Sequence, residues 1–395
     1  MSEKRDYKYK LELASDVKLL QMTPRFDKSR KTMNARRNGR KGFFKPTLNV
    51  RPKKLDVAEG KKTCCEYGEK IANEICKIIG IPSCDVDILK LNMVNVRSKS
   101  RTPKQVPGVI SYVDLSPDEE LVQASTIISG YKYDHQEEYR KIIDPLNRND
   151  SDISDIPMLN NDTHFNNIEL IIPAFMTKVK EDCHGSDDLA EEVKRRIIEM
   201  CVFDCRFANR DRNDENYGLA IGKDSVRFYP LFDNEYILGL SEQTADIQKY
   251  SAASLQEHIN KDLYSVIGIT STPTKISSAS LMTYLFSVYP VETQEAYEKV
   301  MRFTAEDLKN LMDEFEGLPE EHKAYALKIF RLRGKELEGI QQEFIDEKGE
   351  LIEQTHLPGN KPMELVNETS SSRSRSKSKK TENANDDKDR SLEEI

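Results

Sequence analysis

The sequence predicts an α+β protein of two lobes followed by a tail, and three observations carry this prediction. Short strand-like runs and one helical pattern fill residues 1–115, which predicts a small, mostly β lobe with one helix. Apolar residues recur at helical spacing over residues 116–345, which predicts a larger and mainly α lobe. Residues 346–395 end in a stretch rich in serine and charge, which we interpret as a disordered tail.

Residues 8–55 are expected to form short strands with turns between them. Residues 7–13 alternate in polarity, as a half-buried strand does. The dipeptide Asn38-Gly39 is a strong hairpin-turn signal. After this turn, residues 40–46 read as a short strand that is closed by Pro46.

One helix is expected in the first lobe, over residues 63–79. Apolar residues at three-to-four spacing predict its buried face, and Gly80 followed by Pro82 ends it. Two more strand-like runs follow, at residues 86–94 and 109–114. The residues of the buried face are Ala72, Ile75, Ile78 and Ile79.

The second lobe is predicted to be mainly helical from Ser116 onward. Residues 117–120 are expected to open a helix, because acids occupy its first turn. Residues 146–166 are polar and rich in Asn and Asp, which predicts a loop. A long helix is expected over residues 187–208, with an apolar face that consists of Leu189, Val193, Ile197, Met200 and Cys201.

Two signals mark the last helices of the second lobe. Thr304 with Asp307 resembles a capping box, with Asp in place of Glu, ahead of an apolar stripe. Pro319 begins another long helix, which is expected to run to about Phe344.

The composition excludes several classes of protein. Hydrophobic residues make up 37% of the chain and charged residues 32%, and no run of about 18 uncharged apolar residues predicts a transmembrane helix. The first residues lack the apolar core of a signal peptide. The seven cysteines include no CxxC pair, so they do not fit a disulfide scaffold or a zinc ribbon. These features predict a cytoplasmic protein with reduced thiols and no membrane partner.

The net charge of −8 hides a basic first segment. Residues 1–62 hold 19 Lys and Arg against 7 Asp and Glu. Such a segment fits nucleic acid, an anionic membrane or a phosphate-rich small ligand. The acidic balance of the whole chain argues against a dedicated nucleic-acid-binding protein.

The most informative segment is a polar loop, residues 209–216, between an apolar helix and an apolar strand. Asp211 and Asn216 lie five residues apart in it, and Asp233 ends the next apolar run, 22 residues after Asp211. Phosphoryl transfer from ATP needs a carboxylate to accept the proton of the attacking hydroxyl, and an amide oxygen and a second carboxylate to hold Mg²⁺. The spacing of these three residues is the one that protein kinases use for this chemistry.

The first lobe offers candidates for binding the phosphates. The turn that includes Gly39 and Gly42 has a backbone that could cover phosphates, and Lys45 is the strand lysine that could reach their oxygens. A glutamate on the following helix should pair with this lysine, and Glu66 is the candidate. Each candidate also has a purely structural interpretation. Lys45 could be a surface lysine, and Glu66 could belong to a solvated helix face. Asp211 and Asn216 could stabilise their loop through Asx turns.

At these positions the chain resembles the HipA-like kinase family, and in particular its short CtkA-type members, which lack an extra N-terminal subdomain. The family pattern is roughly Asp-x4-Asn-x-Asp-Arg-His-x2-Asn, followed by Pro-Leu-x-Asp-Asn-Gly. Segments 42–46, 65–72, 79–82 and 108–112 of the first lobe agree with the family as well. The residues that match the pattern are Asp204, Asn209, Asp211, Arg212, Asn216 and the Pro-Leu-Phe-Asp of 230–233.

The resemblance implies a two-lobed protein-kinase-like fold and a Ser/Thr kinase that uses ATP and Mg²⁺ to phosphorylate a protein. It implies that Asp211 is the catalytic base and that Asn216 and Asp233 bind the metal. It further implies that Lys45 binds the α- and β-phosphates and that Glu66 orients Lys45. Because the short members lack the N-terminal subdomain, an antitoxin partner is not indicated.

Two positions depart from the family pattern. Asn213 stands where the family usually has His, and Glu235 stands where it has Gly. Asp204 and Asn209 match the pattern, and the resemblance implies that they brace the loop. Glycine tolerates a positive φ, whereas glutamate resists it. A catalytically silent pseudokinase that binds a polyanion is therefore one alternative. A kinase of a lipid or small-molecule hydroxyl is the other.

Overall fold

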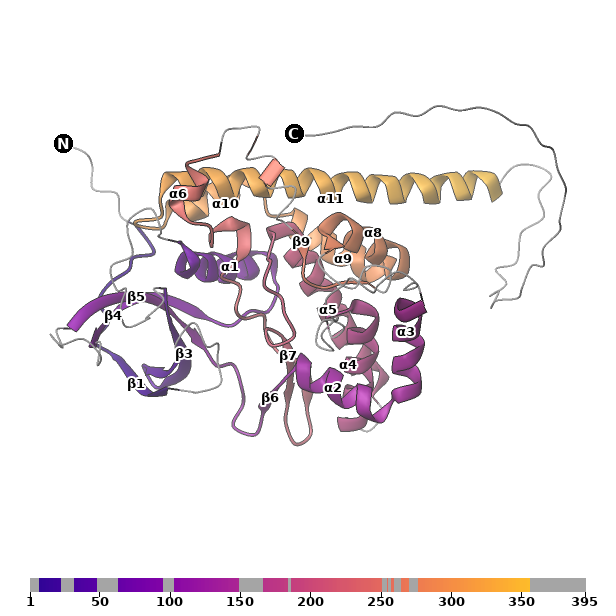
Figure 1. The fold of residues 1–395 in the computed structure, drawn as a ribbon, viewed down its shortest axis with the longest axis horizontal. Helices are drawn as coiled ribbons and strands as arrows, with labels where there is room; N and C mark the ends of the chain where they lie inside the picture. Colours follow the sequence, from indigo (N-terminus) through magenta and orange to yellow (C-terminus); the bar gives the residue numbers. More distant parts are fainter. Residues whose placement is uncertain are drawn as a thin grey trace, which may run out of the picture. The chain divides into compact units, whose positions relative to one another are not determined.

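The structure is a computed structural model, and its element labels follow Figure 1. The predicted polar loop at 146–166 and the predicted tail at 346–395 lie mostly outside the part of the chain that it describes. Residues Met1–Asp346 form one compact unit and Glu347–Ile395 a second. The described residues are 7–22, 32–47, 63–94, 103–148, 166–183, 186–250, 254, 257–258, 264–269 and 276–355.

The first lobe is built on a curled antiparallel sheet of five strands (Figure 1), in the order β1-β2-β3-β5-β4. The predicted hairpin is confirmed, since Arg37 pairs with Arg40 across Asn38 and Gly39. Asn38 has φ 49° and Gly39 has φ 80°, as the two central residues of a type I′ turn require. The strands are β1 (Val17–Met22), β2 (Met33–Arg37), β3 (Arg40–Pro46), β4 (Val86–Val94) and β5 (Pro103–Tyr112).

The alternating residues 7–13 do not form a strand of this sheet, contrary to the prediction. Tyr9 exchanges backbone hydrogen bonds with the segment before the last helix, donating to the oxygen of Glu314 at 3.0 Å and accepting from Glu316 at 2.9 Å. A few residues later, Ala14 donates to the backbone oxygen of Lys90 on β4 at 2.9 Å. The segment thus links two distant parts of the chain.

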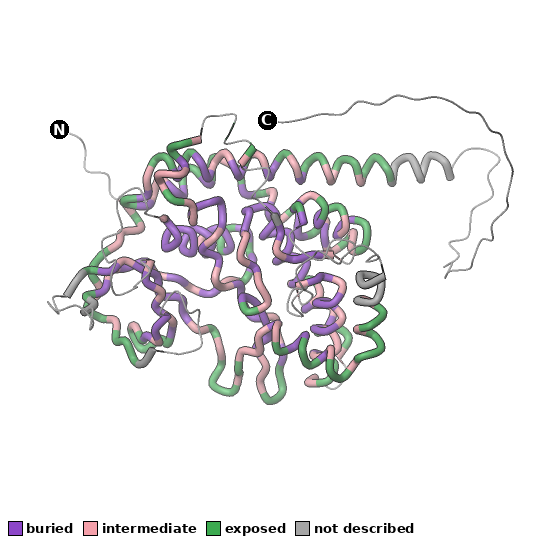
Figure 2. Tube along the Cα trace, viewed as in Figure 1, coloured by how far each residue is buried: buried purple, intermediate pink, exposed green. Residues whose placement is uncertain are grey.

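The helix predicted for the first lobe, α1 (Cys65–Ile79), is confirmed. It ends at Gly80, which has φ 75° and lies in the left-handed region, as the sequence predicts. Ala72, Ile75 and Ile79 are buried as predicted, but Ile78 is 61% exposed and does not belong to the buried face. Figure 2 shows that most of α1 is buried.

The helix expected at residues 117–120 is instead a turn that leads into a short strand. Strand β6 (Glu120–Gln123) pairs with β7 (Gly218–Ile221), which in turn pairs with β8 (Val226–Phe228). The acid in this turn has a different task, because Glu119 accepts hydrogen bonds from the guanidinium of Arg227 at 2.9 and 3.0 Å. Pairing with a strand almost a hundred residues away therefore overrides the local helix signal.

The second lobe is mainly α, as predicted, and α5 (Asp187–Phe207) is its central helix. This helix packs against α4, α8 and α9, and its second half is buried (Figure 2), although Leu189 near its start is 38% exposed. The other helices are α2 (Ala124–Asp134), α3 (Gln136–Arg148), α4 (Ile168–Asp182), α6 (Thr244–Ile247), α8 (Ser278–Val288), α9 (Pro290–Met301), α10 (Ala305–Asp313) and α11 (Glu320–Thr355), with a 3-10 turn η2 (Ile237–Gly239) and two short paired strands, β9 (Tyr264–Ser265) and β10 (Ile276–Ser277).

The predicted signals of the last helices are confirmed. Thr304 accepts from the backbone of Asp307, and the Asp307 side chain accepts from the backbone of Thr304, which together form a capping box before α10. Helix α11 begins at Glu320 but runs to Thr355, well beyond the predicted end near Phe344. Among the described residues, none of these helices has the length and apolar composition needed to cross a lipid bilayer.

Candidate active site

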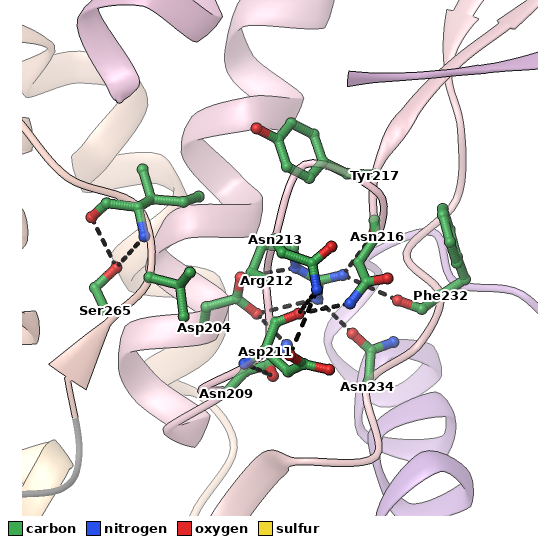
Figure 3. Close-up of polar contacts among 12 residues, drawn as sticks. Asp204, Asn209, Asp211, Arg212, Asn213, Asn216, Tyr217, Phe232, Asn234 and Ser265 are labelled. Carbon is green, nitrogen blue, oxygen red and sulfur yellow. Dashed lines mark hydrogen bonds and ion pairs between the residues drawn. The ribbon is translucent and has the colours of Figure 1, made fainter. Parts of the chain in front are cut away.

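The polar loop at residues 209–216, here called the catalytic loop, is fixed to the end of α5 by one carboxylate. Asp204 in the last turn of α5 accepts from Arg212 at 2.8 and 3.1 Å and from the Asn209 side chain at 2.9 Å (Figure 3). Between them, Ala208 adopts φ 53° and turns the chain out of the helix. The loop-bracing positions predicted for Asp204 and Asn209 agree with this geometry.

Arg212 joins the catalytic loop to a second segment, the turn at residues 232–235. Its guanidinium donates to the backbone oxygen of Phe232 at 2.9 Å and also to the side-chain oxygen of Asn234 (Figure 3). Arg212 is 1% exposed, and its charge is matched by the buried Asp204. The turn that carries Asp233 is therefore held from both sides of that residue by one arginine.

The catalytic loop places Asp211 and Asn216 next to each other. The Asn216 side-chain nitrogen donates to the backbone oxygen of Asp211 at 2.6 Å, and the Asn209 side chain accepts from the backbone of Asp211 at 3.2 Å. Asn213, the departure from the family pattern, accepts from the backbone of Glu215 at 3.0 Å. An asparagine at position 213 thus braces the loop from within.

The departure at Glu235 does not strain the turn. In the described residues around it, the positive φ of 57° belongs to Asp233, while Glu235 is not among the residues with positive φ. Aspartate tolerates the left-handed region better than most residues. The expected conflict at Glu235 is therefore absent, and its side chain, 5% exposed, adds a carboxylate to the site.

Lys45 on β3 reaches this turn and forms an ion pair with Asp233. Burial lowers the pKa of Lys45, but the carboxylates of Asp233, Glu69 and Glu235 outweigh burial and raise the pKa above its ordinary value. Lys45 therefore stays charged among several acids from different elements.

Among the carboxylates of α1, Glu69 is the one whose charge raises the pKa of Lys45, whereas the sequence predicts Glu66 for this position. Burial raises the pKa of Glu69, the charge of Lys45 lowers it, and the backbone of Asn234 hydrogen-bonds to it. Glu66 is also buried, but its charge is not among the main influences on Lys45. Since both residues lie within one turn of α1, the sequence could not separate them.

The site contains one cavity of about 410 Å³. Lys45, Asp211, Asn216 and Asp233 all face it, although they come from three separate segments. Its remaining walls are largely aromatic and apolar, as a site for a nucleotide base requires. They include Phe43, Tyr112, Val113, Leu121, Tyr229, Phe232 and Tyr236.

The predicted glycines are not part of this cavity. Gly39 is six residues before Lys45 along an extended strand, which places it about 20 Å away. Gly42 is needed for strand packing, because a Cβ there would lie 2.6 Å from the backbone oxygen of Ser111 on β5. At the Lys45 end of the sheet, Thr32 lines the cavity just before β2 begins. The Gly39 turn does not line the cavity, and its role in covering phosphates stays a prediction.

Burial and charge also act on Asp211. Burial, together with the charges of Asp233 and Glu235, raises the pKa of Asp211 to about 6. This shift has the direction expected of a carboxylate that accepts a proton near neutral pH. The presence of several carboxylates around Lys45 also favours the binding of a further cation.

The cavity residues fit a magnesium ion by their donor chemistry. The side-chain nitrogen of Asn216 is engaged with Asp211, which leaves its oxygen for another partner, and Asp233 uses one carboxylate oxygen on Lys45. Within the described residues no group of three or more His, Cys, Asp or Glu forms a metal site. Magnesium in kinases needs only one or two protein oxygens besides the phosphates, so two ligands suffice.

Comparison with known proteins adds a structural likeness. No family model and no curated protein matches the chain. The structure is similar to the crystal structure of the Helicobacter pylori proinflammatory kinase CtkA, with a TM-score of 0.58 and 15% identity over 82% of this chain and 96% of that chain. A structure of the Shewanella oneidensis MR-1 toxin–antitoxin system with HipA, HipB and operator DNA matches with a TM-score of 0.44 and 12% identity, over 88% of this chain and 68% of that chain. The chain therefore has the α+β, two-lobed kinase fold of CtkA, as its sequence predicts.

Proposed function

We propose that this protein is an ATP-dependent kinase that transfers the γ-phosphoryl group to a Ser or Thr hydroxyl of a protein. The observation that carries the proposal is the meeting of Lys45, Asp211, Asn216 and Asp233 in one cavity of about 410 Å³. Phosphoryl transfer consists largely of positioning and of stabilising charge, and these four residues supply the groups for both.

Asp211 is the proposed catalytic base. Its backbone is held by Asn209 and Asn216, and its carboxylate lines the cavity. With a pKa raised to about 6, it is ionised at neutral pH and still basic enough to accept the hydroxyl proton. Its main work is to orient the hydroxyl toward the γ-phosphorus.

Lys45 is the proposed ligand of the α- and β-phosphates. In the structure it is paired with Asp233, and Glu69 on α1 is a further carboxylate whose charge, when ionised, raises the pKa of Lys45. We assign Glu69, in place of Glu66, the task of holding Lys45 in position when the lysine turns from Asp233 to the phosphates. Asp204, Asn209 and Arg212 brace the loop and are not assigned contacts with ATP.

Asn216 and Asp233 are the residues that would hold Mg²⁺. When bound, the ion neutralises phosphate charge and orients the γ-phosphoryl group for in-line transfer. The chain's own part is to present two oxygens on the two segments that Arg212 ties together.

The acceptor class rests on resemblance and fold. The catalytic-loop pattern resembles the HipA-like Ser/Thr kinases, and the structurally similar CtkA is a proinflammatory kinase. The backbone conformation of this turn supports an active site. The residue with positive φ is Asp233, whereas Glu235, which stands where the family has Gly, does not need a left-handed conformation.

Transfer of labelled phosphate from ATP tests the proposal. The purified protein is incubated with labelled ATP and Mg²⁺, with itself and a generic protein as acceptors, beside Asp211→Asn. Asp224→Asn is the matched control, because Asp224 is exposed in the turn between β7 and β8. Labelling of Ser or Thr by the wild type and Asp224→Asn, and its loss in Asp211→Asn, is expected. Equal labelling by Asp211→Asn would overturn the assignment.

A further inference from the structure

The residue before Asp211 forms an ion pair outside the cavity. Arg210 donates through Nη2 to the carboxylate of Glu242, and the same nitrogen lies 3.4 Å from the hydroxyl oxygen of Ser241. The side chains of Arg210 and Glu242 are each 19% exposed. The pair is thus partly shielded, and salt screens it less than a surface pair.

Glu242 lies at the end of segment 233–242, which begins at the proposed metal ligand Asp233. This segment also touches α1, because the backbone oxygen of Leu240 accepts from the N–H of Cys64 at 2.8 Å. It touches α11 as well, since the backbone oxygen of Glu242 accepts from His322 Nε2 at 3.1 Å. The ion pair between Arg210 and Glu242 also attaches segment 233–242 to the catalytic loop.

The packing of Gly239 shows how closely this segment lies on α11. Gly239 has φ 68°, and a Cβ there would lie 2.4 Å from Tyr325 and 2.7 Å from Ile329. The segment therefore lies in van der Waals contact with the helix, and a side chain at position 239 would displace it. Arg210 meets Glu242 only while the segment stays in this place.

We infer that Glu242 is a positioning residue whose permanent negative charge replaces an activating phosphate. In many kinases, phosphorylation of the segment after the metal-binding aspartate orders it through a new arginine–phosphate pair. Here the carboxylate of Glu242 is already paired with the guanidinium of Arg210, the residue before Asp211. The pair holds the catalytic loop and segment 233–242 together without a modification. This inference rests on the proposed function.

Glu242→Gln tests this role, because it removes the charge and keeps the shape. We expect kcat to fall about tenfold to a hundredfold, since misplacing a catalytic group by a fraction of an ångström has effects of this size. KM for ATP should stay within about twofold, because Lys45 is untouched. Asp246→Asn is the matched control: Asp246 lies four residues further on, pairs with Lys249 and is partly exposed. Wild-type protein treated with a phosphatase should retain its kcat.

Moving the negative charge from position 242 to position 241 distinguishes a positioning role of Glu242 from a role in folding alone. The Ser241 hydroxyl lies beside the same guanidinium nitrogen, so a carboxylate at position 241 reaches Arg210. Ser241→Asp in the Glu242→Gln background should restore most of the lost kcat. Ser241→Asn in that background is isosteric and neutral, and it should restore nothing. A residue needed only for folding would not respond to this exchange of charge.

The outcomes distinguish this inference from the proposed function. If the wild type transfers phosphate, Asp211→Asn does not, and Glu242→Gln keeps full kcat, then the inference is wrong and the proposed function stands. If the wild type transfers nothing, hydrogen exchange decides instead. Glu242→Gln should then speed amide exchange in residues 209–216 and 233–242, the Ser241→Asp exchange should reverse this effect, and unchanged exchange would overturn the inference.

Discussion

The backbone oxygen of Glu235 lies where a side chain at position 68 would begin, since a Cβ on Gly68 would be 2.5 Å from that oxygen. Glycine at position 68 therefore lets α1 pack directly on the turn that carries Asp233. Glu69 is the next residue of the helix, and the backbone of Asn234 hydrogen-bonds to its carboxylate. This contact sets the position of the Glu69 charge relative to Lys45.

Gly68→Ala is expected to weaken nucleotide binding about tenfold. The added methyl group meets a backbone oxygen, which cannot rotate away as a side chain does, so α1 has to shift and overpacking costs about 1–3 kcal/mol. Calorimetric titration with a non-hydrolysable ATP analogue measures the affinity.

Gly130→Ala is the matched control for this helix glycine. No atom lies within 4 Å of a Cβ at Gly130 on α2, and alanine favours a helix interior. This variant should bind as the wild type does. Wild-type affinity in Gly68→Ala as well would mean that α1 can move without disturbing the phosphate site.

Glu69→Gln and Glu66→Gln should differ in activity. Loss of the Glu69 charge leaves Lys45 held by Asp233, so we expect kcat/KM for ATP to fall about tenfold, whereas Glu66→Gln stays within about twofold. Initial rates of labelled phosphate transfer over a range of ATP concentrations measure both. A loss confined to Glu66→Gln would restore the assignment made from the sequence alone.

Arg212→Lys should destabilise the protein by roughly 3 kcal/mol. Lysine keeps the charge but lacks the planar fork, so buried acceptors on Asp204, Asn216 and Phe232 lose donors. Urea unfolding followed by circular dichroism measures the change in the free energy of unfolding.

Arg227→Lys serves as the comparison for Arg212→Lys. The Arg227 side chain is 39% exposed and pairs with Glu119, so its replacement should cost less than about 1 kcal/mol. Similar losses for the two lysine variants would contradict the central place given to Arg212.

Features with a local cause could be predicted from the sequence. The Asn38-Gly39 turn needs two residues that accept positive φ, and the sequence supplies them side by side. The capping box at Thr304 likewise depends on residues three apart. The polar loop can be recognised because Asp211 and Asn216 lie within a single short segment.

Features with a non-local cause could not be predicted in this way. Whether Glu66 or Glu69 faces Lys45 depends on the rotation of α1, and Gly68 packs against the Glu235 backbone on that side of the helix. The bracing by Arg212 joins residues 20 apart, and the family pattern includes this arginine without assigning it that role.

Asp211→Asn is expected to stabilise the protein above pH 6 in the absence of divalent metal. The pKa of Asp211 is about 6 in the folded state against 3.8 in the unfolded chain, so the folded state holds this proton more tightly. The ionised carboxylate therefore costs stability, and this cost grows as the pH rises from about 4 to about 6. Two pKa units correspond to at most about 3 kcal/mol.

Denaturant unfolding in EDTA at several pH values between 4 and 8 measures this cost as a difference. The free energy of unfolding of Asp211→Asn minus that of the wild type should be smallest near pH 4, rise through pH 5 and 6, and level off above pH 7. Taking the difference removes the contributions that other carboxylates make to both proteins. Asp224→Asn, which changes an exposed acid, should give a flat difference. A flat difference for Asp211→Asn as well would mean that burial and the neighbouring carboxylates do not hold its proton, and the case for Asp211 as the base would lose its electrostatic support.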